Sequence, residues 1–348
     1  MNVSDFDFDL PPDLVAQFPA PERADARLLV LDRAAGTWAH SSISALPRLL
    51  APGDLAVVND TRVFPARLLG RRVPSGGAVE CLLTAHVEGD RWEALVHPGQ
   101  KLKPGAVARF EAEGVTLSAQ ILERRFHGRR EIRLWRDDGG EVDEAVDRIG
   151  HVPLPPYIRR PDEPIDRERY QTIYARYRGS VAAPTAGLHL SERLLAELNE
   201  RGIERTAITL HIGYGTFKPV RSERVEDHTV DPEWIEIGEE AAEAINRAKR
   251  ERRRVLAVGT TTTRALESAA LAGAGAIRAV AEPTGLFVYP GFEFRVVDAL
   301  LTNFHLPRSS LLMLVSAFAG RELVLAAYRD AVAHRYRFYS YGDAMLVL

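Results

Sequence analysis

The feature that most limits the fold of this chain is a pattern that occurs three times: strand, polar loop, helix. It occurs near residues 54, 206 and 255, where the apolar runs 54–59, 206–212 and 255–258 end in polar or glycine-containing loops. Short, continuously apolar runs are typical of strands that are covered on both faces of a sheet. Strands that alternate with helices predict an α/β core with a cleft where the strands end.

The loops after these three runs contain groups that can hold a ligand. The first reads N-D-T-R at 59–62, the second H-I-G-Y-G-T-F-K-P at 211–219, and the third G-T-T-T-T-R at 259–264. A Gly-Thr turn at the start of a helix offers free N–H groups and hydroxyls to a carboxylate or phosphate. A capped helix start and an Asx turn at 59–60 are the structural alternatives, and each loop alone does not decide between them.

A run of small residues, G-S-V-A-A-P-T-A-G-L-H-L at 179–190, precedes a helix that we expect at 191–201. Its Gly, Ala and Ser residues are too small to build a core, and such backbone allows a flat ligand to approach closely. The polar side chains of Thr185 and His189 remain for contacts. A tight loop that only leads into the helix explains the same residues.

Between residues 67 and 136 the pattern changes to short alternating segments separated by Gly and Pro turns. Segments at 79–86, 91–96, 106–111, 116–122 and 131–134 predict a small antiparallel β-barrel. We therefore expect a discontinuous α/β, barrel-like main domain at 1–60 and 150–348, and an inserted β-barrel domain at 61–149.

The expected barrel carries a local excess of positive charge. Residues 62–136 contain 14 Lys or Arg against 8 Asp or Glu, a net charge of +6, whereas the whole chain has a net charge of −3. Such an asymmetry attracts phosphates, and an ordinary solvated barrel surface would carry it as well.

Several common functional motifs are absent from the sequence. It contains no G-x-G-x-x-G after a strand, no P-loop and no G-x-S-x-G, and its ten histidines lack H-E-x-x-H spacing. Cys81 is its one cysteine, so we expect no disulfide within the chain and no metal site. Neither a signal peptide nor an apolar run of about 20 residues is evident, which predicts a cytoplasmic protein without a membrane span.

Several longer motifs together resemble one family, the S-adenosylmethionine:tRNA ribosyltransferase-isomerases of queuosine biosynthesis. They are V-N-D-T-R at 58–62, G-S-V-A-A-P-T-A-G-L-H at 179–189, H-I-G-Y-G-T-F-K-P-V at 211–220, A-V-G-T-T-T-T-R-A-L-E-S at 257–268, T-N-F-H-L-P-R-S-S-L-L-M-L-V-S-A-F-A-G at 302–320 and Y-S-Y-G-D-A-M-L at 339–346. The family pattern H-x-M-H-x-E reads H-T-V-D-P-E here, so Asp231 stands where the second His is expected.

The resemblance implies transfer of the ribosyl part of S-adenosylmethionine to 7-aminomethyl-7-deazaguanine at the wobble position of a tRNA. Adenine and methionine leave, and epoxyqueuosine remains. The sulfonium acidifies the C5′ hydrogens, so a positioned base can abstract one, and adenine departs better when an acid protonates it. S-adenosylmethionine is then a substrate, and we expect no cofactor. The implied partner is a tRNA with a GUN anticodon, and we expect a monomer that binds no membrane.

The matching motifs supply candidate site residues. As catalytic residues we expect His211 and His228 to handle protons, Glu233 to orient or assist, and His189 to act at the nucleoside pocket. The residues expected to bind substrate are Asp60, Arg62, Thr185, Gly187, Tyr214, Gly215, Thr260, Thr261, Thr262, Arg264, Asn303 and His305. Among them, Arg264 and the threonines of the G-T-T-T-T-R loop (Thr260, Thr261 and Thr262) are expected at the methionine carboxylate or ribose. Asp60 and Arg62 are expected at the target nucleotide.

Two other classes of function remain open from the residues alone. An S-adenosylmethionine-dependent RNA methyltransferase would release S-adenosylhomocysteine in place of adenine. A non-catalytic RNA-binding protein would use the basic barrel, but it leaves the three polar strand-end loops unexplained.

Overall fold

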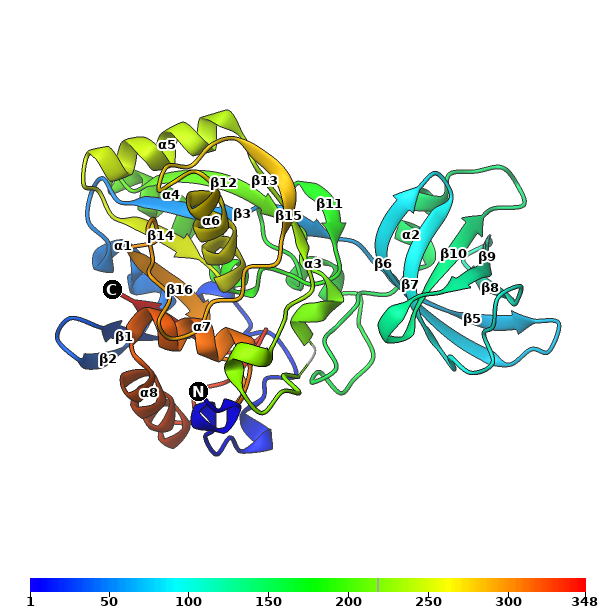
Figure 1. The fold of residues 1–348 in the computed structure, drawn as a ribbon, viewed down its shortest axis with the longest axis horizontal. Helices are drawn as coiled ribbons and strands as arrows, with labels where there is room; N and C mark the ends of the chain where they lie inside the picture. The colour runs from blue at the N-terminus through cyan, green and yellow to red at the C-terminus, as the bar shows by residue number, and fades with distance from the viewer. Residues whose placement is uncertain (218) are drawn as a thin grey trace.

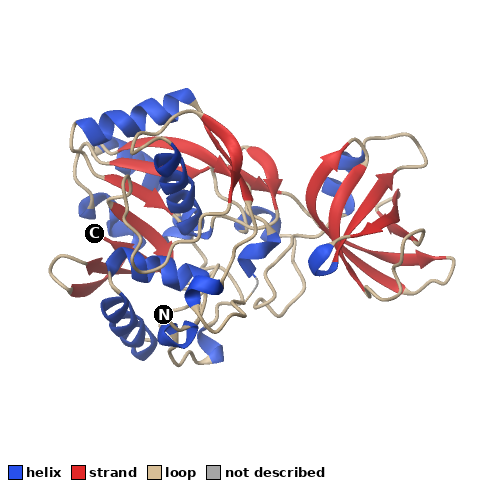
Figure 2. Ribbon diagram, in the orientation of Figure 1, coloured by secondary structure: helices blue, strands red, loops and turns tan. Residues whose placement is uncertain are grey.

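The structure is a computed structural model that describes residues 1–217 and 219–348. A large mixed α/β body carries both chain termini, and a small β-barrel projects from it along the longest axis (Figures 1 and 2). The predicted fold class is confirmed: a large sheet with helices and a closed antiparallel barrel.

Both faces of the main sheet are covered, which explains why its central strands are continuously apolar. In β3 (Leu55–Asn59), Leu55 and Val57 belong to the core on one face, and Ala56 and Val58 belong to the core on the other. The first face is covered by α5 (Glu239–Arg250), α6 (Thr260–Ala272), α7 (Ser310–Ala319) and α8 (Arg321–Ala333). The second is covered by α1 (Leu46–Leu49) and α4 (Glu192–Glu200).

Nine strands form the main sheet. Their spatial order is β15 (Val280–Thr284), β13 (Glu233–Ile237), β12 (Glu204–Leu210), β3, β14 (Val255–Val258), β16 (Ala299–Asn303), β17 (Ala344–Val347), β1 (Arg27–Asp32) and β2 (Thr37–Ser42). The sheet is open, with β15 and β2 at its edges, so the closed barrel is confined to the insert. Strands β12, β3, β14 and β16 are parallel neighbours, and their carboxyl ends therefore meet at one edge.

Local signals explain where the helices begin and end. The Ser191 hydroxyl accepts a hydrogen bond from the Leu194 N–H at 3.2 Å and caps α4, a contact that contributes about 1 kcal/mol. Gly259 has a φ of 99°, a conformation that glycine adopts at little cost, and it turns the chain from β14 into α6.

Six antiparallel strands close the barrel. Their order is β10 (Arg129–Trp135), β7 (Arg91–His97), β6 (Ala78–Glu88), β5 (Arg67–Val73), β8 (Val107–Ala112) and β9 (Val115–Arg124). Helix α2 (Val142–Ile149) packs on the barrel core through Ala145, Val146 and Ile149. Next to the barrel, β4 (Thr61–Val63) pairs in parallel with β11 (Tyr177–Ser180) (Figure 1).

Two further short elements are α3 (Asp166–Arg169) and the 3-10 helix η6 (Thr185–His189), which lies in the small-residue run. Among the described residues no single helix is long and apolar enough to cross a membrane. The bent pair α7 and α8 meets that test by length and composition only.

Candidate active site

The carboxyl ends of the parallel strands carry the polar loops that the sequence predicted. Asn59 holds two of these ends together from a fully buried position. Its amide Nδ2 donates to the Leu210 carbonyl at 2.9 Å, and its Oδ1 accepts from the Leu210 N–H at 3.0 Å and the Thr61 N–H at 3.1 Å. The side chain thus replaces ladder hydrogen bonds where β3 and β12 separate.

A first pocket of about 560 Å³, here called the Asn303 pocket, opens where β14 and β16 end. It lies at the amino terminus of α6 and is bordered by η6 from the small-residue run. Its lining residues include five of the predicted ones, which are Thr185, Thr260, Thr261, Asn303 and His305, together with Tyr157, Tyr339 and Ser340.

Two polar atoms of the Asn303 pocket lack a hydrogen-bond partner among the described residues. They are Thr261 Oγ1 and Asn303 Oδ1, on side chains that are buried. Asn303 is held in place by its Nδ2, which donates to the Tyr339 carbonyl at 3.0 Å and contacts His189 Nε2 at 3.2 Å. Because an unpaired buried polar atom is costly, these two atoms are suited to a polar ligand.

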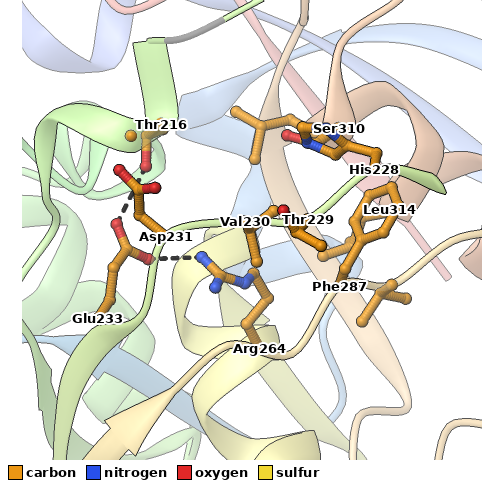
Figure 3. Close-up of a pocket in the computed structure, with 13 residues that line it drawn as sticks. Thr216, His228, Thr229, Val230, Asp231, Glu233, Arg264, Phe287, Ser310 and Leu314 are labelled. Carbon is orange, nitrogen blue, oxygen red and sulfur yellow. Dashed lines mark hydrogen bonds and ion pairs between the residues drawn. The ribbon is translucent and has the colours of Figure 1, made fainter. Parts of the chain in front are cut away.

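A second pocket of about 580 Å³, here called the Arg264 pocket, adjoins the first because Thr216 and Leu311 line both. Predicted residues Gly215, His228, Glu233 and Arg264 line it, with Asp231, Phe287, Ser310 and Leu314 (Figure 3). The two pockets together form one cleft along the strand ends.

Glu233 and Arg264 form a buried ion pair in this pocket, with 2.5 Å between Glu233 Oε2 and Arg264 Nη1 (Figure 3). Oε1 of Glu233 also accepts from the Gly213 N–H at 2.9 Å and from the Thr216 hydroxyl at 3.1 Å. Arg264 Nε donates to the Leu286 carbonyl at 2.9 Å, whereas its Nη2 is buried without a partner among the described residues. Glu233 therefore orients Arg264, which keeps one donor for a ligand.

Three histidines at the cleft are kept neutral by burial. Burial lowers the pKa of His305 to about 3 and that of His189 to about 4, and it also lowers the pKa of His228. His305 Nε2 is 2.8 Å from the Thr302 hydroxyl, and the His228 ring packs edge-on against Phe287. A neutral imidazole has one ring nitrogen available to accept a proton.

His211 lies outside the residues that line either pocket. Its Nδ1 is 2.8 Å from the Thr61 hydroxyl, and burial lowers its pKa. The ring packs against Gly179, where an added Cβ would lie 2.6 Å from His211 Cε1. A glycine is needed at 179 so that β11 can approach this ring.

The chain matches the family model described as queuosine biosynthesis protein over residues 3–347. It belongs to this family. A 53% identical relative from Anaeromyxobacter and a 50% identical relative from Aquifex aeolicus are both named S-adenosylmethionine:tRNA ribosyltransferase-isomerase, and each alignment covers 99% or more of both chains. A crystal structure of S-adenosylmethionine tRNA ribosyltransferase from Thermotoga maritima is 35% identical and covers 99% of this chain and 100% of its own, with a TM-score of 0.55.

In this member of the queuosine biosynthesis family, the remaining predicted residues do not line the two pockets. The Thr262 hydroxyl donates to the Val258 carbonyl at 2.8 Å and is fully buried. Gly187 leaves room for Tyr174, whose hydroxyl would lie 2.2 Å from an added Cβ. Tyr214 packs on the barrel core, and the Asp60 carboxylate accepts from the Thr209 hydroxyl at 2.7 Å.

Asp60 and Arg62 lie at the junction of body and barrel. Burial raises the pKa of the Asp60 carboxyl, and its backbone carbonyl accepts from the Arg176 N–H at 2.7 Å. Arg62 is exposed on β4. Neither residue lines one of the two pockets, and the first barrel strand, β5, begins at Arg67.

Sequence reasoning missed several residues that build the cleft. Arg129 of the barrel reaches the Arg264 pocket, with its Nη2 2.6 Å from Asp231 Oδ2. Phe287 comes from the segment between β15 and β16, and Tyr339 and Ser340 come from the Y-S-Y-G motif at 339–342. The Y-S-Y-G motif was the available signal for the last two.

One group of potential metal ligands occurs among the described residues, away from both pockets. It consists of His40, Asp330 and His334, whose ligand atoms lie within 4.8 Å of one another. These groups already have partners: His40 contacts the Tyr336 hydroxyl at 2.9 Å and Asp330 at 3.1 Å, and His334 contacts Asp330 at 3.3 Å. The three side chains thus pair with one another and with Tyr336 at the surface, outside the two pockets.

Proposed function

We propose that this protein transfers and isomerises the ribosyl moiety of S-adenosylmethionine onto 7-aminomethyl-7-deazaguanine at the wobble position of a tRNA. Adenine and methionine are released and epoxyqueuosine remains on the tRNA. The observation that carries this proposal is the full-length family match together with about 50% identity to proteins of that name. S-adenosylmethionine is consumed, and no cofactor is required.

The unpartnered polar atoms suggest how S-adenosylmethionine lies in the cleft. Arg264 Nη2 is a charged donor, so it binds the methionine carboxylate in the Arg264 pocket. Asn303 Oδ1 is an acceptor in the adjoining pocket, so it accepts a hydrogen bond from adenine or the ribose. The N–H groups at the start of α6, with Thr260 and Thr261, bind the polar atoms between them.

Proton transfer is then assigned to the neutral groups in the cleft. His228 lines the Arg264 pocket beside the sulfonium and accepts a C5′ proton. His305 and Thr261 supply hydrogen-bond donors to adenine as it departs from C1′. Glu233 positions Arg264, and His189 positions Asn303, so both act through a neighbour.

His211 is proposed as a positioning residue. Through Thr61 it supports the junction between the main sheet and β4, which leads into the barrel. Gly215 lines the Arg264 pocket, and Thr185 lines the Asn303 pocket. Gly187 and Thr262 line neither pocket and act through packing, Gly187 against Tyr174 and Thr262 through its hydrogen bond to the Val258 carbonyl.

We further propose that residues 61–149 form an inserted domain that binds the anticodon arm of a tRNA with a GUN anticodon. Many barrel arginines pair with acids, but six basic residues that are not buried have no acidic partner among the described residues. They are Arg62, Arg71, Arg72, Lys101, Lys103 and Arg124. Such charges bind phosphates in a salt-dependent manner. The protein is proposed to act as a cytoplasmic monomer.

Product analysis tests this function directly. The protein is mixed with S-adenosylmethionine and a tRNA that carries 7-aminomethyl-7-deazaguanine, and the products are separated by chromatography. Free adenine and methionine that form only with this tRNA are the expected result. S-adenosylhomocysteine would identify a methyltransferase, and tRNA binding without any turnover would identify a non-catalytic binding protein.

A further inference from the structure

Phe126 is the most exposed large apolar side chain among the described residues. It is 89% exposed, whereas the next most exposed such residues, Phe18 and Val87, are 52% exposed. It lies in the 3-10 turn η5 (Phe126–Gly128), which connects β9 to β10 at one end of the barrel. An aromatic ring this exposed contributes little to the folded core, so it is available for a contact outside the chain.

The residues around Phe126 are basic. Arg124 and Arg125 precede it and are exposed, and Arg129 follows the turn. Arg125 pairs with Glu131, whereas Arg124 has no acidic partner within the described part of the chain. An aromatic ring among arginines is the combination that binds single-stranded nucleic acid, where the ring stacks on a base and a cation contacts the backbone.

The turn also lies near the proposed active site. Arg129 Nη2 is 2.6 Å from Asp231 Oδ2, and Asp231 lines the Arg264 pocket. Phe126 precedes Arg129 by three residues, so the chain between them spans at most about 10 Å. The barrel end that carries Phe126 is therefore the end that contacts the pocket wall.

We infer that Phe126 stacks on an unpaired base of the anticodon loop that flanks the nucleotide being modified. This inference rests on the proposed function and adds the residue that receives the loop. A base whose edge is modified must leave the stack of the loop, which exposes the faces of its neighbours. A solvated aromatic ring beside the pocket covers one of those faces, and Arg124 contacts the adjacent phosphate.

The test compares Phe126→Ala, Phe126→Leu and Phe126→Trp with the wild type. Val87→Ala is the matched control. Val87 lies in β6 just before the β6–β7 turn, and the strand register places this turn at the end of the barrel opposite to Phe126. Binding is measured by the anisotropy of a labelled anticodon stem-loop, and turnover by adenine release. Since stacking contributes about 1–3 kcal/mol per base, F126A is expected to weaken binding about tenfold, with F126W near the wild type.

The expected pattern is specific to stacking. F126A and F126L raise KM for tRNA similarly, kcat and KM for S-adenosylmethionine stay unchanged, and V87A behaves as the wild type. Wild-type binding by F126A would overturn the inference, and so would full binding by F126L, which keeps the apolar volume without the ring. The binding assay needs no turnover, so an absence of adenine release in the wild type contradicts the proposed function and leaves the stacking test intact.

Discussion

Protonation of His305 in the unfolded state is expected to make the stability of this protein depend on pH. The side chain is 5% exposed, and burial lowers its pKa from 6.5 to about 3. Because the folded-state pKa is lower than the unfolded one, the unfolded chain binds more protons between these values. The free energy of unfolding therefore falls as the pH falls below about 6.5, and continues to fall until about pH 3.

The magnitude follows from the two pKa values. Between pH 7 and pH 5, an unfolded histidine takes up most of a proton while the folded His305 stays neutral. The resulting loss is about 2 kcal/mol for this one residue. His189, with a pKa of about 4, contributes a loss of similar size over the same interval.

The assay is urea denaturation of the wild type and His305→Gln at pH 7 and pH 5. Glutamine keeps a hydrogen-bonding group opposite the Thr302 hydroxyl and does not titrate, so H305Q should lose about 2 kcal/mol less than the wild type on acidification. His334→Gln, at an exposed position on the surface, is the control and should follow the wild type. Parallel pH profiles for H305Q and the wild type would refute the reasoning, and ring NMR titration of His305 gives an independent reading.

Four further predictions concern the cleft, strand β11 and the barrel. Arg264→Met leaves the buried Glu233 carboxylate without its charged partner, so urea denaturation should show a loss of about 3–5 kcal/mol, which the double variant with Glu233→Met partly restores. In the single variant Arg264→Met, KM for S-adenosylmethionine should rise at least about tenfold, since a charged hydrogen bond contributes about 1.5–3 kcal/mol. Gly179→Ala should displace the His211 ring and lower stability by about 1–3 kcal/mol in the same denaturation assay. Lys103→Ala should reduce the slope of log binding constant against log salt for tRNA by about 1.

Matched variants separate these effects from general damage. Gly285→Ala adds a Cβ with nothing within 4 Å and should leave the unfolding midpoint unchanged, in contrast to G179A. Additive losses in the Arg264 and Glu233 variants would contradict a direct coupling of the two side chains. An unchanged salt slope in K103A would remove that residue from the RNA-binding surface.

Elements with strong local signals were predicted nearly residue by residue. The apolar run 255–258 is β14, and α6 begins at Thr260, at the Gly-Thr turn where a helix start was expected. Ser191 caps α4, and Gly202 with a φ of 77° follows its end. The alternating segments became barrel strands, because period-two patterns and Gly or Pro turns are also local properties. These signals fix the class of fold and the position of the strand-end loops.

The orientation of single side chains depends on tertiary placement, which the sequence does not specify. Successive residues at a strand end point to opposite sides, so Ile212 lines the Asn303 pocket while the neighbouring His211 faces Gly179. Tyr339 and Ser340 reach the same pocket because β17, near the end of the chain, pairs between β16 and β1. Such contacts join segments that are separated along the chain, by 36 residues for Asn303 and Tyr339, and no local pattern records them.

The departure from the family pattern at Asp231 gains a physical explanation from the barrel. A carboxylate at this position accepts a charge-assisted hydrogen bond from Arg129, whereas a neutral histidine would offer no negative charge to that guanidinium. Gly215 accommodates the residue, since an added Cβ would lie 2.9 Å from Asp231 Oδ2. Asp231 therefore lines the Arg264 pocket and also contacts the insert, and Arg129 is three residues from Phe126. The proposed base-stacking residue is therefore three residues along the chain from an arginine that contacts the wall of the pocket where S-adenosylmethionine is proposed to bind.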